Sequence, residues 1–170
     1  MKKFKKLLFT IFAIQTLCGC TSLTEVEYPE NMSRDRNTSY KNWTLSKISH
    51  YEFTYNSGSN FSSGRSKSIT VKKTKVTAAR YNRDVEFVYN DKYFKVKKGQ
   101  LVHSFEYIPT IEILFQKIFE CYKDEKCVVK HEKYHNEFGF PIHITIGSRD
   151  LEDGDYFFGI RNFKYKNEWT

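Results

Sequence analysis

TIEILFQKIFECYKDEKCVVKHEKYHNEFGFPIHITIGS, residues 110–148, holds the clearest structural signals of the chain. The first part of this stretch predicts a helix over 110–122, because Thr110 has the side chain of an N-cap and the apolar residues after it recur at the spacing of one helix face. These apolar residues are Ile111, Leu114, Phe115, Ile118 and Phe119. We expect this stripe to pack on a sheet.

The second part of the stretch predicts a β-hairpin. Residues 128–135 and 141–148 are rich in β-branched residues, and Asn136-Glu137-Phe138-Gly139 stands between them as a turn. In the second strand Ile142, Ile144 and Ile146 share one face. His143 and Thr145 are therefore expected on the opposite face.

The remainder of the chain predicts more strands and one short helix. Strand-like patterns cover 51–55, 69–71, 76–80, 85–89, 93–96, 101–107 and 156–165, and residues 57–64 read as a Ser/Gly/Asn loop. A short helix over 39–48 begins at Ser39 as a possible N-cap. We expect an α+β domain with an antiparallel sheet of about six to eight strands, the 110–122 helix on one face and the 39–48 helix at the edge.

The N-terminus resembles the signal of a bacterial lipoprotein. Four lysines precede an apolar run over 7–17, and the run ends in Leu17-Cys18-Gly19-Cys20. As a helix this run covers about 17 Å, too short for a hydrocarbon core of about 30 Å. The resemblance implies a removed signal peptide over 1–19, acyl chains on Cys20, and a flexible tether over 20–38 before a single domain over 39–170.

The same signal indicates a location. The residue after Cys20 is Thr21 and not aspartate, which among lipoprotein signals points to the outer membrane. We expect the domain to face the periplasm. An ordinary secretory signal that releases a soluble protein is the alternative.

Part of the positive charge of the chain lies in the expected signal peptide. Loss of the four signal lysines lowers the formal net charge from +8 to +4. The remaining basic residues alternate with apolar ones instead of forming a block: Lys72, Lys73, Lys75, Arg80, Lys95, Lys97 and Lys98. Basic strands with aromatic residues can bind single-stranded nucleic acid. We expect a solvated sheet face instead, and no nucleic acid partner.

Two cysteines remain when Cys18 leaves with the signal and Cys20 is acylated. Cys121 and Cys127 then form one pair in an oxidising compartment. A disulfide between them would stabilise the fold by roughly 2 kcal/mol and join the helix end to the next strand. A reactive thiol and a metal ligand are the alternatives.

His131-Glu132-Lys133-Tyr134-His135 matches the H-E-x-x-H pattern of zinc peptidases. That chemistry needs a helix, on which the two imidazoles lie about 6 Å apart and the glutamate acts as general base. On a strand the same two positions lie roughly 13 Å apart. We favour the hairpin, and a zinc-dependent hydrolase with His131 and His135 as ligands and Glu132 as base is the alternative.

Other chemical signals are weak. The chain has no G-x-S-x-G, G-x-G-x-x-G or Walker motif. Asp150, Glu152, Asp153 and Asp155 could bind Ca²⁺ through oxygens, but their spacing is not that of an EF-hand and predicts a solvated acidic loop. His50 and His103 stand singly and are expected to be structural. We expect no cofactor.

A set of short motifs resembles a family of uncharacterised bacterial lipoproteins. In order along residues 40–165 they are Trp43, Tyr51-Glu52-Phe53-Thr54-Tyr55, Pro109-Thr110-Ile111-Glu112-Ile113-Leu114-Phe115, Tyr134 to Pro141, and the tail from Asp153 to Phe163. This chain departs from the family in having His135 where aspartate is usual. The resemblance implies strand–turn–strand structure over 128–147 and no mechanism.

These signals together predict a function without catalysis. We expect a tethered periplasmic binding or envelope-maintenance module, held on the membrane by acyl chains on Cys20 and in contact with an unknown envelope protein or ligand. The candidate contact surface consists of exposed aromatic residues among Tyr51, Tyr55, Tyr89, Tyr93, Tyr134 and Tyr156.

Overall fold

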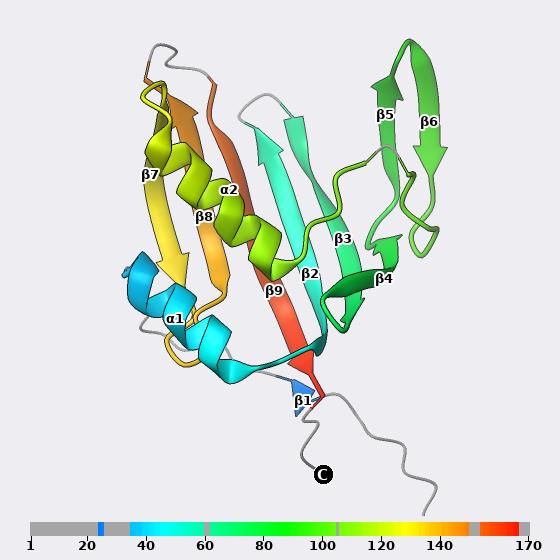
Figure 1. Ribbon diagram of the computed structural model, residues 1–170. Coiled ribbons are helices and arrows are strands. Elements are labelled where there is room, and N and C mark those ends of the chain that lie inside the picture. The colour runs from blue at the N-terminus through cyan, green and yellow to red at the C-terminus, as the bar shows by residue number, and fades with distance from the viewer. Residues whose placement is uncertain (1–23, 26–34, 60–61, 105, 150–153, 167–170) are drawn as a thin grey trace, which may run out of the picture.

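The computed structural model describes residues 24–25, 35–59, 62–104, 106–149 and 154–166 (Figure 1). The elements in chain order are β1 (Thr24–Glu25), α1 (Arg36–Ser46), β2 (His50–Ser59), β3 (Ser62–Lys72), β4 (Lys75–Tyr81), β5 (Val85–Tyr89), β6 (Lys92–Val96), α2 (Ile111–Lys123), β7 (Cys127–Tyr134), β8 (Pro141–Ser148) and β9 (Tyr156–Tyr165). The expected signal peptide and Cys20 lie outside the described residues, as does most of the expected tether.

The main sheet is antiparallel and has the order β4-β3-β2-β9-β8-β7. Its central strand β9 comes last in the chain and joins a half made of β2 to β4 to a half made of β7 and β8. Strand β1 pairs with the end of β9, with Thr24 opposite Tyr165. Strands β5 and β6 form a separate hairpin that stands away from the sheet (Figure 1).

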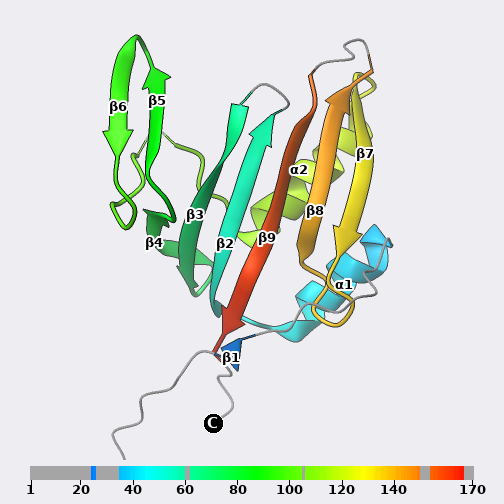
Figure 2. The ribbon, with the colours of Figure 1, turned by 180° about the vertical axis from the view of Figure 1, so that it is seen from behind.

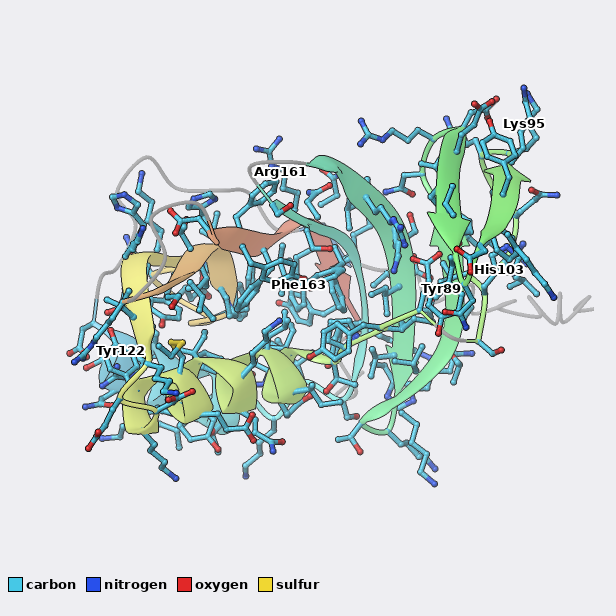
Figure 3. All side chains as sticks on the ribbon, turned by 90° about the horizontal axis from the view of Figure 1, so that it is seen from above. Tyr89, Lys95, His103, Tyr122, Arg161 and Phe163 are labelled. Atoms are coloured by element: carbon cyan, nitrogen blue, oxygen red, sulfur yellow. A yellow bond between two sulfur atoms is a disulfide. The ribbon has the colours of Figure 1, made fainter. Side chains whose placement is uncertain are left out.

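Both helices lie on the same face of the main sheet, and no described helix covers the opposite face (Figures 1 and 2). The core fills the space between helices and sheet, where Trp43 packs edge-on against Tyr51 and Phe115 stacks on Tyr134. We call the sheet surface opposite the helices the open face. Figure 3 shows Phe163 between sheet and helices and Arg161 pointing away from the helices.

A β-bulge explains why these two neighbours on β9 point in opposite directions. Residues two apart on a regular strand share a face. Here Thr54 pairs with Arg161 and Glu52 with Lys164, so β9 contains one extra residue, and Asn162 takes a positive φ of 50°. Arg161 faces the open side by alternation with the buried Ile160, and the bulge after it returns Phe163 to the core.

Helix α2 confirms the prediction for residues 110–122. Thr110 is its N-cap, and the Thr110 side chain accepts a hydrogen bond from the Ile113 amide at 3.4 Å. The buried residues of α2 are Ile111, Leu114, Phe115, Ile118 and Cys121. Cys121 forms the predicted disulfide with Cys127, the first residue of β7. The bridge therefore joins the end of α2 to the sheet.

Helix α1 begins earlier than its sequence pattern predicts. Asp35, not Ser39, is the N-cap, and the Asp35 carboxylate accepts from the amides of Asn37 and Thr38. Ser39 is instead buried inside the helix, where its carbonyl lies against Gly139. A Cβ at Gly139 would lie 1.9 Å from the Ser39 oxygen, so this contact needs the glycine of the β7–β8 turn.

The predicted loop over 57–64 is wrong over most of its length, because β2 continues to Ser59 and β3 begins at Ser62. Gly58 and Gly64 lie beside each other over the ring of Phe157, and a Cβ at Gly58 would lie 2.8 Å from the Gly64 Cα atom. The small residues therefore serve close packing within the sheet.

The predicted strand over 101–107 is also wrong. In the described part of this segment only Leu101 pairs with the sheet, through an isolated bridge to Arg80. The segment instead crosses the end of the helix-covered face and leads into α2 (Figure 1). The predicted strands over 141–148 and 156–165 are confirmed as β8 and β9.

Candidate functional site

The residues of the H-E-x-x-H pattern lie on strand β7 and just beyond it, as the hairpin interpretation predicts. His131 pairs with Thr145 and faces the open side, whereas Glu132 pairs with Ile144 and faces the core. The Glu132 carboxylate accepts from Tyr134 at 2.9 Å. His135 is buried, and its ring stacks on Phe140. The two histidines and the glutamate therefore do not meet around one metal ion.

Of the four acidic candidates near residue 150, Asp155 lies among the described residues. Asp150, Glu152 and Asp153 lie outside the described residues. Asp155 forms an ion pair with Lys130 at 2.7 Å. Within the described part of the chain, no three His, Cys, Asp or Glu side chains gather in an arrangement that could hold a metal.

The six aromatic candidates do not form one contact surface. Tyr51, Tyr55 and Tyr134 are buried in the core, which corrects the expectation that they are exposed. Tyr156 is half-buried, and its hydroxyl hydrogen-bonds to that of Tyr55 at 2.9 Å.

The last two candidates, Tyr89 and Tyr93, are exposed by 42% and 63%. They lie on opposite faces of the β5–β6 hairpin, because Tyr93 pairs with Val88 and Tyr89 with Lys92. Because the two exposed tyrosines face opposite ways, they do not support the hypothesis of an aromatic contact surface.

A cavity of about 330 Å³ lies on the helix-covered side, between the β2–β3 hairpin and Tyr89. A buried ion pair borders it, with Lys67 Nζ 2.7 Å from Glu106 Oε2. The Glu106 carboxylate also accepts from Tyr81 and pairs with Arg65 at 3.2 Å. Burial alone would raise the pKa of Glu106, but the hydrogen bonds from Lys67 and Tyr81 and the two positive charges hold it below its usual range.

The charges beside this cavity are satisfied within the chain. Lys67 donates a further hydrogen bond to the Tyr107 carbonyl at 3.2 Å, and Arg65 stacks on Phe87 of the β5–β6 hairpin. The network thus attaches the residues before α2 and the hairpin to strand β3. We assign it a structural role, because a ligand would have to displace one of these partners.

Five basic side chains gather on the open face, and we call them the open-face cluster. Its members are Arg83 after β4, His131 and Lys133 of β7, His143 of β8 and Arg161 of β9. All five are exposed. Within the described residues, no carboxylate forms an ion pair with any of them. Arg83 donates a hydrogen bond to the Gly64 carbonyl. Among the described residues, the positive charges of Arg83, Lys133 and Arg161 therefore have no carboxylate partner.

The cluster surrounds a shallow hollow of about 310 Å³. Arg83, His143 and Arg161 line it together with Asn56 and Phe157. The imidazole of His143 lies nearly parallel to the Phe157 ring, with centroids 6.5 Å apart. The hollow therefore combines charged donors, an amide and a flat aromatic surface.

Gly159 forms part of the floor of the hollow. A Cβ there would lie 2.0 Å from the carbonyl oxygen of Ile142, so only glycine lets β8 and β9 approach this closely.

The surroundings of His143 lower the pKa of its imidazole. Partial burial lowers its pKa below the usual histidine value, and the charges of Lys133, His131 and Arg161 lower it further. Lys133 is the cross-strand partner of His143, and Arg161 lines the same hollow as His143. A bound anion would oppose this effect.

The sequence indicated only part of this cluster. The alternation over 141–148 correctly placed His143 opposite the isoleucines, and Ile144 is buried as predicted. Lys133 and Arg161 were missed because no pattern within β7 or β9 shows that these two strands bring their side chains to the same surface as His143. The lysines that the sequence did single out lie elsewhere, and Lys95 and Lys97 pair with Glu86 and Asp84 on and beside the β5–β6 hairpin.

Among the described residues, no helix is both long and apolar enough to cross a bilayer. No curated protein and no solved structure matches the chain. The model of one family, described as a family of unknown function (DUF6174), matches residues 35–165. This match runs from the N-cap of α1 to the last residue of β9 and includes every described element except β1. The chain therefore belongs to this family of unknown function.

Proposed function

We propose that this protein is a lipid-anchored envelope protein that binds an anionic saccharide on the open face of its sheet and catalyses no reaction. The anchor is Cys20, which follows a short apolar run and Gly19 in the manner of a lipoprotein signal. The domain faces the periplasm from the outer membrane.

The open-face cluster is the observation that carries the binding role. Solvent-exposed cations on neighbouring strands repel one another, and this arrangement is stabilised when an anion lies between them. A hydrogen bond between a guanidinium and a carboxylate or phosphate is short and about twice as strong as a neutral one. Arg83 and Arg161 border the same hollow and can offer such bonds from two sides.

The other lining groups favour a saccharide as the carrier of the negative charge. Phe157 and His143 offer a flat surface for the apolar face of a sugar ring. Asn56 has an amide that can donate to and accept from hydroxyl groups. A simple inorganic anion would use the cations alone and leave these groups without a role.

Absence of catalysis is part of the proposal. The candidate base Glu132 faces the core and already accepts a hydrogen bond from Tyr134, while His131 faces the opposite side. The open face offers donors and a flat surface, which bind and orient a ligand.

The decisive test is a calorimetric titration of the chain from residue 20, with Cys20→Ser, against galacturonate oligomers and uncharged maltohexaose. We expect binding of the acidic oligomer alone. The double variant Arg161→Gln/Lys133→Gln should weaken it at least about tenfold, or about 1.4 kcal/mol. The matched control Lys41→Gln/Lys123→Gln removes two exposed charges from the helices, on the other side of the sheet, and should change the affinity less than about twofold.

Two results would overturn this assignment. Equal losses in the two double variants would mean that net charge, not the cluster, drives binding. Tighter binding of single-stranded DNA than of the acidic oligomer would replace the saccharide with a nucleic acid. The anchor is tested separately by the intact mass of the protein purified from membranes, which should include acyl chains.

A further inference from the structure

A second group of cations lies at the end of the sheet where β1 pairs with β9. Lys72 ends β3 and pairs with both His50, the first residue of β2, and Lys75, the first residue of β4. The Lys166 amide donates to the His50 carbonyl at 2.9 Å. Lys47 ends α1 just before β2. We call Lys47, Lys72, Lys73, Lys75 and Lys166 the basic end.

The lysines of the basic end lack carboxylate partners. Within the described residues, none of the five forms an ion pair with a carboxylate. A cavity of about 350 Å³ opens there, lined by Lys72 and Lys166 and also by His50 and Glu52. Glu52 accepts a hydrogen bond from Thr70 at 3.2 Å and brings one negative charge to this end, and Glu25 of β1 lies opposite Lys164. Five lysines against these two glutamates leave the described part of this end positively charged.

The β3–β4 turn places a lysine where the backbone disfavours one. Lys73 and Thr74 take positive φ values of 49° and 64°, which suit Gly, Asn or Asp. The β5–β6 turn has the same conformation and contains Asn90 and Asp91, at 47° and 59°. The β3–β4 turn therefore contains a strained residue pair, and Lys73 adds a positive charge at its tip. Backbone strain of this kind often marks a functional constraint.

The expected anchor lies close to the same end. Thr24 pairs with Tyr165, and Cys20 precedes Thr24 by four residues. Because an extended chain covers at most about 3.6 Å per residue, a link of four residues can reach no farther than about 14 Å from β1. Figure 1 shows β1, the start of β2 and the end of β9 at the same extremity of the sheet. This step rests on the lipid anchor proposed above.

We propose that the basic end sits on the anionic phospholipid headgroups of the membrane that holds the anchor. Lysines attract a negative membrane surface within about one Debye length, or about 8 Å at physiological salt. The anchor and the five lysines together then hold the sheet with its strands rising from the bilayer. The open face points sideways in this orientation and stays accessible to the envelope space.

The first test uses the chain from residue 20 with Cys20→Ser, so that no acyl chain contributes. Every described helix and strand lies within this chain. We expect it to sediment with vesicles of phosphatidylcholine and phosphatidylglycerol, to be released by salt, and not to bind phosphatidylcholine alone. Since each lysine near such a surface contributes about a fivefold gain, Lys72→Gln/Lys73→Gln/Lys75→Gln should weaken binding about a hundredfold.

The matched control is Lys41→Gln/Lys98→Gln/Lys123→Gln, which removes the same charge from exposed lysines elsewhere. It should keep vesicle affinity within about threefold of the parent chain. An equal loss in the two triple variants would overturn the proposal. So would loss of vesicle binding in Arg161→Gln/Lys133→Gln with the basic end intact, because the headgroups would then occupy the open face.

The second test uses the acylated protein in the same two kinds of vesicle. Lysine acetylation, read by mass spectrometry, should slow at Lys72, Lys73 and Lys75 only in vesicles that contain phosphatidylglycerol. Lys123, on the far end of α2, should react equally in both. Unchanged acetylation of the turn lysines would refute the orientation.

The two proposals fail separately. A membrane-purified protein without acyl chains would remove the anchor while the vesicle result stood. An acylated protein whose turn lysines stay reactive would keep the anchor and remove the headgroup contact.

Discussion

Replacing Glu106 with Gln is expected to be among the most damaging single changes in the chain. The side chains of Lys67 and Glu106 are only 4% and 3% exposed, and their charged atoms lie 2.7 Å apart. Gln keeps the shape of the side chain and removes its charge. Lys67 would then remain buried as an ammonium group, with the Tyr107 carbonyl as a neutral partner.

The magnitude follows from that unpaired charge. Removing one partner of a buried ion pair typically costs about 3 to 5 kcal/mol. The hydrogen bond from Tyr81 to the carboxylate would also weaken, since its acceptor loses its charge. Because a domain of this size has a total stability of about 5 to 15 kcal/mol, the variant should lose a large part of it.

Urea unfolding at neutral pH measures the loss, and Glu86→Gln provides the control. Glu86 pairs with Lys95 at 2.8 Å, but these side chains are 50% and 64% exposed. Because solvent screens this exposed pair, breaking it should change the unfolding free energy little. Equal losses for the two variants would refute the view that Lys67–Glu106 is a buried, dry pair. The double variant Lys67→Met/Glu106→Met should recover much of the stability.

The pH dependence has a definite sign. The pKa of Glu106 is lower in the folded chain than in the unfolded one. Its contribution is therefore complete above the unfolded carboxyl's pKa and is lost as the pH falls through the folded pKa. The parent chain should lose stability on acidification more steeply than Glu106→Gln. Parallel pH profiles of unfolding free energy would contradict this reasoning.

Three other changes test other parts of the fold and site. Cys121→Ser/Cys127→Ser opens a short disulfide loop and should cost about 2 kcal/mol in urea unfolding; no change would mean that the bridge does not constrain the unfolded chain. Gly139→Ala should lower the melting temperature sharply, because Gly139 has a φ of +78° and the new Cβ would meet the Ser39 carbonyl oxygen. The control is Gly99→Ala, because Gly99 has a similar φ of +84° but open space around it. Its smaller loss would measure the backbone strain alone. Lys133→Gln should raise the pKa of His143 in an NMR titration by removing one nearby positive charge, and an unchanged pKa would refute the proximity of the open-face cluster.

The elements with a strong apolar period were predictable from sequence. Helix α2 carries a complete apolar stripe behind a capping threonine, and β8 alternates isoleucines with polar residues. Residues 57–64 failed because Ser and Gly favour loops by local propensity, whereas Gly58 and Gly64 are selected for packing around Phe157. The burial of Tyr51 and Tyr55 was present in the alternation with Phe53, but aromatic content alone does not reveal which face is covered.

The open-face cluster could not be read from the sequence as a unit. Its members come from four segments, and strand order is needed to bring them together: β9, last in the chain, lies between β2 and β8. The bulge at Lys130 also changes the alternation of β7 between Val129 and His131, before Lys133. A sequence pattern can predict which side chains of one strand share a face. A site built from several strands can be predicted only when the strand order and the pairing register are known.

The position of β9 also governs when this fold can form. Strands β2 to β4 and strands β7 to β8 are two separate hairpin units until residues 156–165 insert between them. A nascent chain that lacks these residues would expose two unpaired strand edges, at β2 and at β8, and would bury little of the shared core. Closure of the sheet therefore awaits the synthesis of β9, and the long sequence separation between β2 and β9 makes that step slow. Late closure suits the export that we propose, because a chain that folds late can pass through a translocation channel before it becomes compact.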